Sequence, residues 1–212
     1  MNRLWCLTLL SFSALAPAGG QTLEISPVAG WTRISKAPLG YASTVEGYDD
    51  DTTFRNGYSY GVRITINTPR YYGHELTYLQ TDAKVRTVLQ ATEDDPRETK
   101  IGRVLNHQLS YNFLAYWMPK NERFRPFMTV GLEGRRSGNP HIDGWPSRPT
   151  YNYGFNYGGG IKIRLFSHAL VRLDLRDNFT GKPYGLQFSN IITTAGGLVR
   201  QQQASVGIGI TF

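Results

Sequence analysis

The chain has 212 residues, including 23 glycines and 13 tyrosines, and its formal net charge at pH 7 is +7. This length suits one domain, and the abundance of glycine and aromatic residues favours strands joined by turns. The basic residues form no run or stripe, so we expect no binding to nucleic acid. After the first 18 residues, no stretch is apolar enough for a transmembrane helix, which needs about twenty apolar residues.

The first 18 residues predict a secretory signal peptide. Met1-Asn2-Arg3 is a short basic start, residues 4–15 are apolar, and Ala16-Pro17-Ala18 offers a small-residue cleavage site. The alternative is a buried N-terminal helix. Cys6 is the single cysteine and would leave with the signal. The expected mature domain, residues 19–212, therefore holds neither a disulfide nor a thiolate metal site.

Eight later segments alternate apolar and polar residues with a period of two, which indicates strands whose two faces meet different surroundings. Strands of about ten residues with this pattern are typical of transmembrane barrels. The sequence therefore predicts an all-β fold, a single eight-stranded antiparallel up-and-down transmembrane β-barrel. The segments are 22–32, 58–66, 72–80, 104–117, 125–133, 152–166, 169–177 and 198–212.

Two of these segments have particular features. Pro27 lies in the first, and because proline cannot donate to a strand ladder we expect a bulge or local irregularity there. The last segment alternates most strictly. Its apolar face comprises Ala204, Val206, Ile208, Ile210 and Phe212, and its other face comprises Ser205, Gly207, Gly209 and Thr211.

The connections alternate between short and long. Residues 67–70, 118–124 and 167–168 form short turns, whereas residues 33–57, 81–102, 134–151 and 178–197 form long connections. Membrane barrels place short turns in the periplasm and long loops outside the cell. We therefore expect four external loops.

Charged residues of both signs fall at inward positions of the predicted barrel. An unpaired charge there would be costly, so we expect a paired, hydrogen-bonded network that plugs the lumen. In a soluble β-sandwich, the alternative fold, the same side chains would face water. The predicted network comprises Glu24, Arg63, Glu75, Glu133, Lys162, Arg164, Arg172, Asp174 and Arg176.

Three segments carry a family resemblance: Arg-Pro-Phe-Met-Thr-Val-Gly-Leu at 125–132, Tyr-Gly-Gly-Gly-Ile-Lys at 157–162 and Arg-Leu-Asp-Leu-Arg-Asp at 172–177. The chain resembles the eight-stranded bacterial outer-membrane β-barrels typified by the transmembrane domain of outer-membrane protein A. The resemblance implies a monomer in the outer membrane of a diderm bacterium, in contact with lipid and lipopolysaccharide. It also implies that the assembly machinery recognises the last strand through Val206, Ile208, Ile210 and Phe212.

The sequence favours a non-enzymatic structural or surface-interaction role, without metal or cofactor. The acidic clusters 49–51 and 93–95 lack the spacing of a calcium loop. Two alternatives remain open. One is a barrel that binds or transports a small molecule, and the other is a lipid A-modifying enzyme. An enzyme of that kind needs a serine activated by a nearby histidine. His141, near Ser137 and Ser147, is the nearest candidate; His74 and His107 have lipid-facing parity, and His168 lies in a turn.

Overall fold

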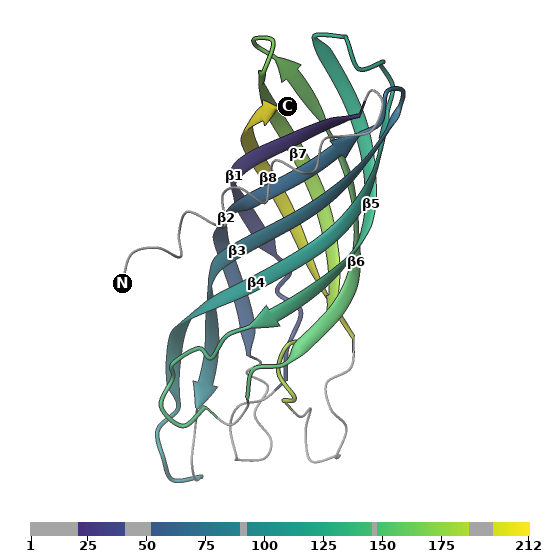
Figure 1. Cartoon of the computed structure of the whole chain (residues 1–212). Coiled ribbons are helices and arrows are strands. Elements are labelled where there is room, and N and C mark those ends of the chain that lie inside the picture. The colour runs from purple at the N-terminus through teal and green to yellow at the C-terminus, as the bar shows by residue number, and fades with distance from the viewer. Residues whose placement is uncertain (1–20, 41–51, 90–92, 146–147, 187–196) are drawn as a thin grey trace, which may run out of the picture.

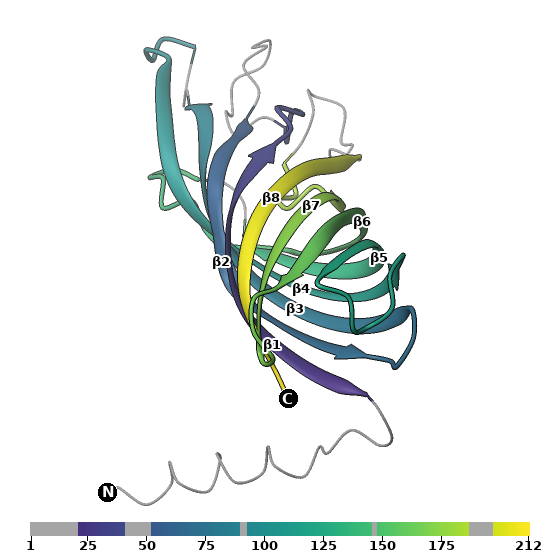
Figure 2. The ribbon, with the colours of Figure 1, turned by 90° about the horizontal axis from the view of Figure 1, so that it is seen from above.

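The computed structural model describes residues 21–40, 52–89, 93–145, 148–186 and 197–212, and these residues form a closed antiparallel barrel (Figure 1). Neighbouring strands pair in chain order and β8 pairs with β1, so the ring has no free edge (Figure 2). The predicted fold is confirmed. The strands are β1 Thr22–Ile34, β2 Thr53–Asn67, β3 Tyr72–Leu89, β4 Glu98–Tyr116, β5 Phe124–Ser137, β6 Tyr151–Arg164, β7 Ala169–Gly181 and β8 Leu198–Thr211.

The predicted signal peptide, its boundary with the barrel domain and the acidic cluster 49–51 lie outside the described residues. Within the described part of the chain, no helix has the length and apolarity to cross a membrane.

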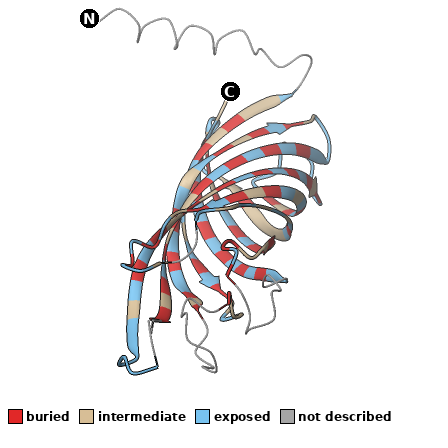
Figure 3. Ribbon diagram, turned by 90° about the horizontal axis from the view of Figure 1, so that it is seen from below, coloured by how far each residue is buried: buried red, intermediate tan, exposed pale blue. Residues whose placement is uncertain are grey.

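Burial alternates along the strands and reverses the order found in soluble proteins (Figure 3). Arg63 and Glu75 are at most 1% exposed, whereas Leu132 and Leu175 are 72% and 68% exposed. An apolar outer face suits hydrocarbon, where every backbone N–H and C=O needs a partner within the protein. Closure of the sheet supplies those partners.

β3 and β4 are longer than the sequence predicted. They have 18 and 19 residues, whereas the other strands have 13 to 15. The predicted long connection at 81–102 was therefore wrong, since most of it is strand. The apolar-outward pattern stops at Gln80 because the next outward side chains, Asp82 and Lys84, are polar, yet the backbone pairing continues. The β3–β4 hairpin consequently projects beyond the ends of the other strands (Figure 1).

Pro27 interrupts pairing on one side of β1. The partners with β8 run through Ile25↔Ile210 and resume in the same register at Val28↔Gly207. Pairing with β2 is continuous, with Pro27 opposite Val62. The irregularity expected at Pro27 is thus a local gap in the β1–β8 seam, and the shift in register lies instead in β2, between Arg55 and Tyr58.

The segment after β5 follows the projecting edge of β4. β5 ends at Ser137, opposite Asn106, so the part of β4 that precedes Asn106 extends past it. The Gly138 N–H donates to the Leu105 carbonyl oxygen at 2.9 Å, which continues the ladder beyond the strand. Pro140 then lies against Gly102. This segment covers an edge that would otherwise present free backbone groups.

Candidate functional site

The middle of the lumen holds a cluster of three guanidinium groups around two carboxylates. Arg172 pairs with Glu75 and, at 2.7 Å from Nε to Oδ2, with Asp174. Arg176 lies 2.6 Å from Glu75 and 3.2 Å from Asp174. Arg63 Nη1 lies 2.7 Å from Asp174 Oδ2. All five side chains are at most 5% exposed. Each charge therefore has an opposite charge within contact distance.

Strand order shows that this cluster crosses the lumen. Glu75 lies on β3 and Arg172 lies on β7, which stand four strands apart in a closed ring of eight and so face each other across the barrel. Arg63 on β2 also contacts Asp174 on β7, and two strands, β1 and β8, lie between β2 and β7 in the ring. Contacts between strands that are not neighbours span the interior. At this depth the lumen is bridged by hydrogen-bonded ion pairs.

Two further ion pairs flank the central cluster. Lys162 Nζ on β6 lies 2.6 Å from Glu24 Oε2 on β1, another contact between distant strands. Arg135 Nη2 lies 3.1 Å from Glu133 Oε1 on the same inward face of β5. Gln108 donates to Glu133 at 2.8 Å and so ties β4 to this pair. Predicted lumen residues on six strands are thereby brought into one charged interior.

Arg164 differs from the prediction. It has inward parity, but β6 ends there, and its guanidinium lies at the mouth with the short turns, where it donates to the Asn121 and Lys120 carbonyl oxygens. Sequence reasoning missed two inward arginines, Arg125 and Arg135, although both have the parity of the predicted set. The Arg125 guanidinium lies 3.4 Å from the Tyr116 ring centroid and donates to the carbonyl oxygen of Arg70 at 2.9 Å.

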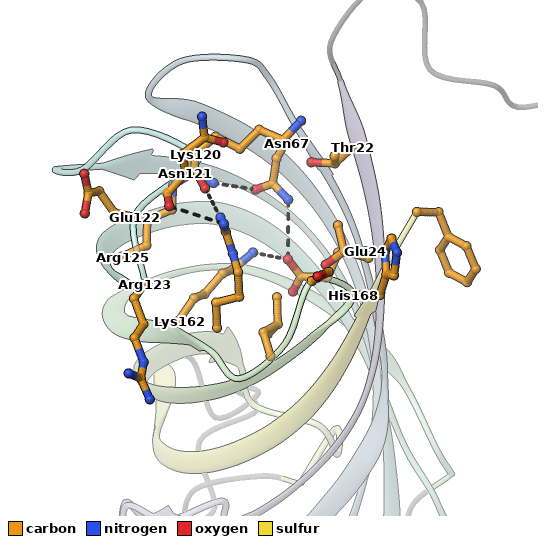
Figure 4. Close-up of a pocket in the computed structure, with 15 residues that line it drawn as sticks. Thr22, Glu24, Asn67, Lys120, Asn121, Glu122, Arg123, Arg125, Lys162 and His168 are labelled. Atoms are coloured by element: carbon orange, nitrogen blue, oxygen red, sulfur yellow. Dashed lines mark hydrogen bonds and ion pairs between the residues drawn. The ribbon is translucent and has the colours of Figure 1, made fainter.

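A pocket of about 280 Å³ opens at the short-turn mouth (Figure 4). The Glu24–Lys162 ion pair lies in its wall, beside Asn67, whose side-chain amide donates to Glu24 at 3.4 Å. Partial burial and the nearby Arg125 and Arg164 lower the pKa of Lys120. Basic groups outnumber acids in this lining. The charged lining residues are Glu24, Lys120, Glu122, Arg123, Arg125, Lys162 and Arg164.

A cluster of buried apolar side chains that the sequence did not predict lies at the opposite mouth. Inward side chains of β1, β2, β3, β4 and β8 meet side chains from two of the long connections. The Tyr184 hydroxyl donates to the Gly138 carbonyl oxygen at 2.7 Å, and burial raises the pKa of this phenol. Trp145 packs edge-on against Tyr184, with 5.1 Å between ring centroids. The cluster comprises Ile34, Leu39, Phe54, Ala83, Val85, Val104, Tyr184, Leu186 and Val199.

The described histidines form no catalytic arrangement with a described serine, and Ser147, one of the two serines near His141 in sequence, lies outside the described residues. His74 and His107 lie on the outer face, where each shares a 2.8 Å hydrogen bond with a tyrosine hydroxyl, of Tyr111 and Tyr78 respectively. His141 and His168 are exposed. Among the described residues, no hydrogen bond joins a histidine to a serine, and no group of three or more potential metal ligands occurs.

The family model for the outer membrane protein beta-barrel domain matches residues 4–212. The chain belongs to this family. Its place is therefore the outer membrane. Barrels of this type place short turns in the periplasm and long loops outside the cell, and the two ends are called periplasmic and extracellular on that basis. A search of curated proteins found no match to this sequence.

Solved structures show the same fold at low sequence identity. OprG from Pseudomonas aeruginosa is 12% identical, with a TM-score of 0.61 and coverage of 92% of this chain and 96% of that one. The N-terminal β-barrel domain of Pseudomonas aeruginosa OprF is 15% identical, with a TM-score of 0.54 and coverage of 90% and 97%. Ail of Yersinia pestis, solved with the heparin analogue sucrose octasulfate, is 13% identical, with a TM-score of 0.51 and coverage of 92% and 100%.

Proposed function

We propose that this protein is a non-enzymatic, non-conducting outer-membrane barrel with a structural or surface-interaction role. One observation carries the proposal: the ion-paired cluster that joins β3 to β7 across the lumen. The apolar cluster at the extracellular mouth adds a second, independent barrier. A transporter would need a continuous water path past both barriers.

The extracellular end supports the interaction part of the proposal. The connections that follow β1 and β7 insert Leu39, Tyr184 and Leu186 into the apolar cluster, so each is anchored on the barrel. The β3–β4 hairpin extends as paired strand beyond the ends of the other strands (Figure 1). Loops held by a rigid scaffold are common sites of recognition.

Conductance in planar lipid bilayers tests the closed lumen. We expect the purified mature protein to insert without producing ion-conducting steps, because the cluster and the apolar mouth both block the pore. The triple variant Arg172→Ala, Arg176→Ala and Phe54→Ala serves as the positive control, since it removes side chains from both barriers. Stable conductance steps from the unaltered protein would refute the proposal and support the transport alternative.

The lipid A-modifying alternative is tested by mass spectrometry of lipid A from cells with and without the protein. We expect identical acyl patterns. A changed pattern that disappears on His141→Ala would establish an enzyme and contradict the proposal.

We also propose that the apolar face of β8 is the assembly signal. The side chains of Val206, Ile208, Ile210 and Phe212 are all exposed on the outer face, with Phe212 at 64%. We expect Phe212→Ala to reduce the amount of folded barrel in the outer membrane, measured as the heat-modifiable band on an unboiled gel. Phe166→Ala is the matched control, since Phe166 is 74% exposed in a periplasmic turn. Equal losses from the two changes would contradict a specific signal.

A further inference from the structure

A second pocket, of about 500 Å³, lies on the outside of the barrel, near the extracellular end of its wall. β4 and β5 form one side of it, and the segment that covers the β4 edge forms the other. Basic and imidazole side chains gather there without any acidic residue in the lining. The lining residues are Arg103, Leu105, His107, Arg136, Gly138, Asn139, His141 and Pro149.

The two arginines present positive charge to this pocket. Arg136 lies directly opposite His107, and its guanidinium carbon lies 5.5 Å from the Tyr151 ring centroid. In the described part of the chain, Arg136 pairs with no carboxylate. Arg103 is held by Asp82 through two hydrogen bonds, of 2.8 and 2.5 Å, yet its side chain remains 68% exposed. The Arg136 guanidinium is therefore open to an anion, and Arg103 keeps Nη1, the nitrogen that Asp82 does not bind.

A row of basic residues continues from the pocket around the outer face. Lys84 on β3 lies opposite Arg103, and Arg55 on β2 lies opposite Lys84. Like charges directly opposite each other destabilise a sheet. A multivalent anion seated along this row would remove that repulsion, whereas no acidic side chain other than Asp82 does so among the described residues at these positions.

On the periplasmic side of this pocket, the outer surface of β4 and β5 is apolar. The next outward side chains along β4 are Leu109 and Tyr111, and the next that are apolar along β5 are Leu132 and Val130, all more than half exposed. The pocket thus lies where hydrocarbon gives way to headgroups. A ligand that places an anionic group in the pocket can lay acyl chains on this apolar surface.

We propose that the pocket binds lipopolysaccharide of the outer leaflet, with phosphate groups of its lipid A contacting Arg103 and Arg136. Guanidinium groups match phosphate oxygens in geometry and charge. Arg136 lies opposite His107, which is four residues from Arg103 along β4. The two arginines are therefore about 14 Å apart along the strand direction at the usual strand rise. A glycolipid with more than one phosphate spans that separation better than a phospholipid with one. The proposal rests on the outer-membrane location and is independent of the closed lumen.

Native mass spectrometry of the detergent-purified mature protein tests this site. The added probes are bisphosphorylated lipid A, fully dephosphorylated lipid A, phosphatidylglycerol and inorganic phosphate. We expect bisphosphorylated lipid A to bind best, and the double change Arg103→Ala with Arg136→Ala to weaken it by about tenfold or more, since each lost contact is a charge-assisted hydrogen bond. Arg200→Ala is the matched control, because Arg200 also pairs with an outward aspartate, Asp177, but lines no part of this pocket.

Four outcomes would overturn the proposal. They are equal binding by the double variant, an equal loss in Arg200→Ala, equal binding of dephosphorylated lipid A or phosphatidylglycerol, and displacement of lipid A by millimolar inorganic phosphate alone. Heat-modifiable gel migration verifies that each variant is folded. If the double variant fails to assemble, Arg136→Gln replaces it, because Arg136 makes no carboxylate pair that folding would lose.

Discussion

In the middle of the barrel, Arg172 and Arg176 pair with Glu75 across the lumen and with Asp174 on their own strand. At the extracellular mouth, Phe54 and the apolar side chains around it occupy the lumen instead. Both regions face the lumen, and in the proposed function each is a barrier within it. The middle depends on complete pairing of charges, because a charge left alone there has no water to compensate it. The stability of the apolar cluster at the mouth depends on how completely its side chains fill the space, since they contribute by burial and close packing. Substitutions in the two regions should therefore destabilise the barrel in different ways.

The largest effect should come from breaking the charged middle. Arg172→Met removes one guanidinium that contacts both carboxylates and leaves the remaining arginines to neutralise them. We expect the free energy of unfolding to fall by about 3 kcal/mol or more, as for other buried pairs that lose one partner. Urea titration of the barrel refolded in lipid vesicles measures this change.

Arg200→Met is the control for that experiment. Arg200 makes a similar pair with Asp177, but its side chain is 51% exposed on the outer face. Exposed pairs contribute about 0–1 kcal/mol. Equal destabilisation by the two changes would mean that the ion pairs in the lumen contribute no more to the free energy of unfolding than an exposed pair does.

A smaller effect should follow a cavity in the apolar mouth. Leu39→Ala truncates a side chain that is 0% exposed in the cluster. We expect a loss of about 2 kcal/mol, near the low end for such changes because a loop can partly relax into the space. The loss should appear as faster amide hydrogen exchange at the extracellular ends of β2 and β8, and little elsewhere. Leu198→Ala, the same change at a 55% exposed outward position, should leave exchange unaltered.

The smallest effect should be a response of the mouth to alkaline pH. Burial raises the pKa of Tyr184 above its ordinary value. The stability that this shift contributes is complete below the pKa of an exposed tyrosine, about 10, and declines as pH rises toward the higher folded value. Protease cleavage after Lys182 should therefore increase above pH about 10. Tyr184→Phe should abolish this dependence while losing only the hydrogen bond to Gly138. An identical pH profile in the variant would contradict the assignment.

Inside and outside could be predicted from the sequence because strand parity is a local property. Arg63, Glu75 and Asp174 were assigned inward from their immediate neighbours, and the structure buries all three. Parity does not give depth along the axis, so Arg164 was placed with the interior residues although it lies at the periplasmic mouth. The same limit hid the specific pairings, which join strands far apart in sequence.

The apolar mouth could not be predicted for a different reason. Leu39, Tyr184 and Leu186 come from connections without alternation, and Val85 and Val199 are single apolar residues at inward positions near strand ends. Only the closed ring brings them together. The length of β3 was missed because the first three outward residues after Gln80 (Asp82, Lys84 and Arg86) are polar. Such a pattern resembles a loop, but it also describes a strand that has left the hydrocarbon.

The extension of β3 beyond the hydrocarbon determines how far the β3–β4 hairpin reaches from the membrane surface. From Gln80 to Leu89, β3 continues for nine residue steps, about 30 Å at the usual strand rise, with β4 paired alongside. Antibodies, bacteriophage and host surfaces that approach the cell should therefore encounter the hairpin, near Asp94 and Asp95, ahead of the ends of the other strands. A peptide epitope inserted there should be stained by antibody on intact cells, whereas one inserted at Ser167 should stay hidden until the membrane is permeabilised.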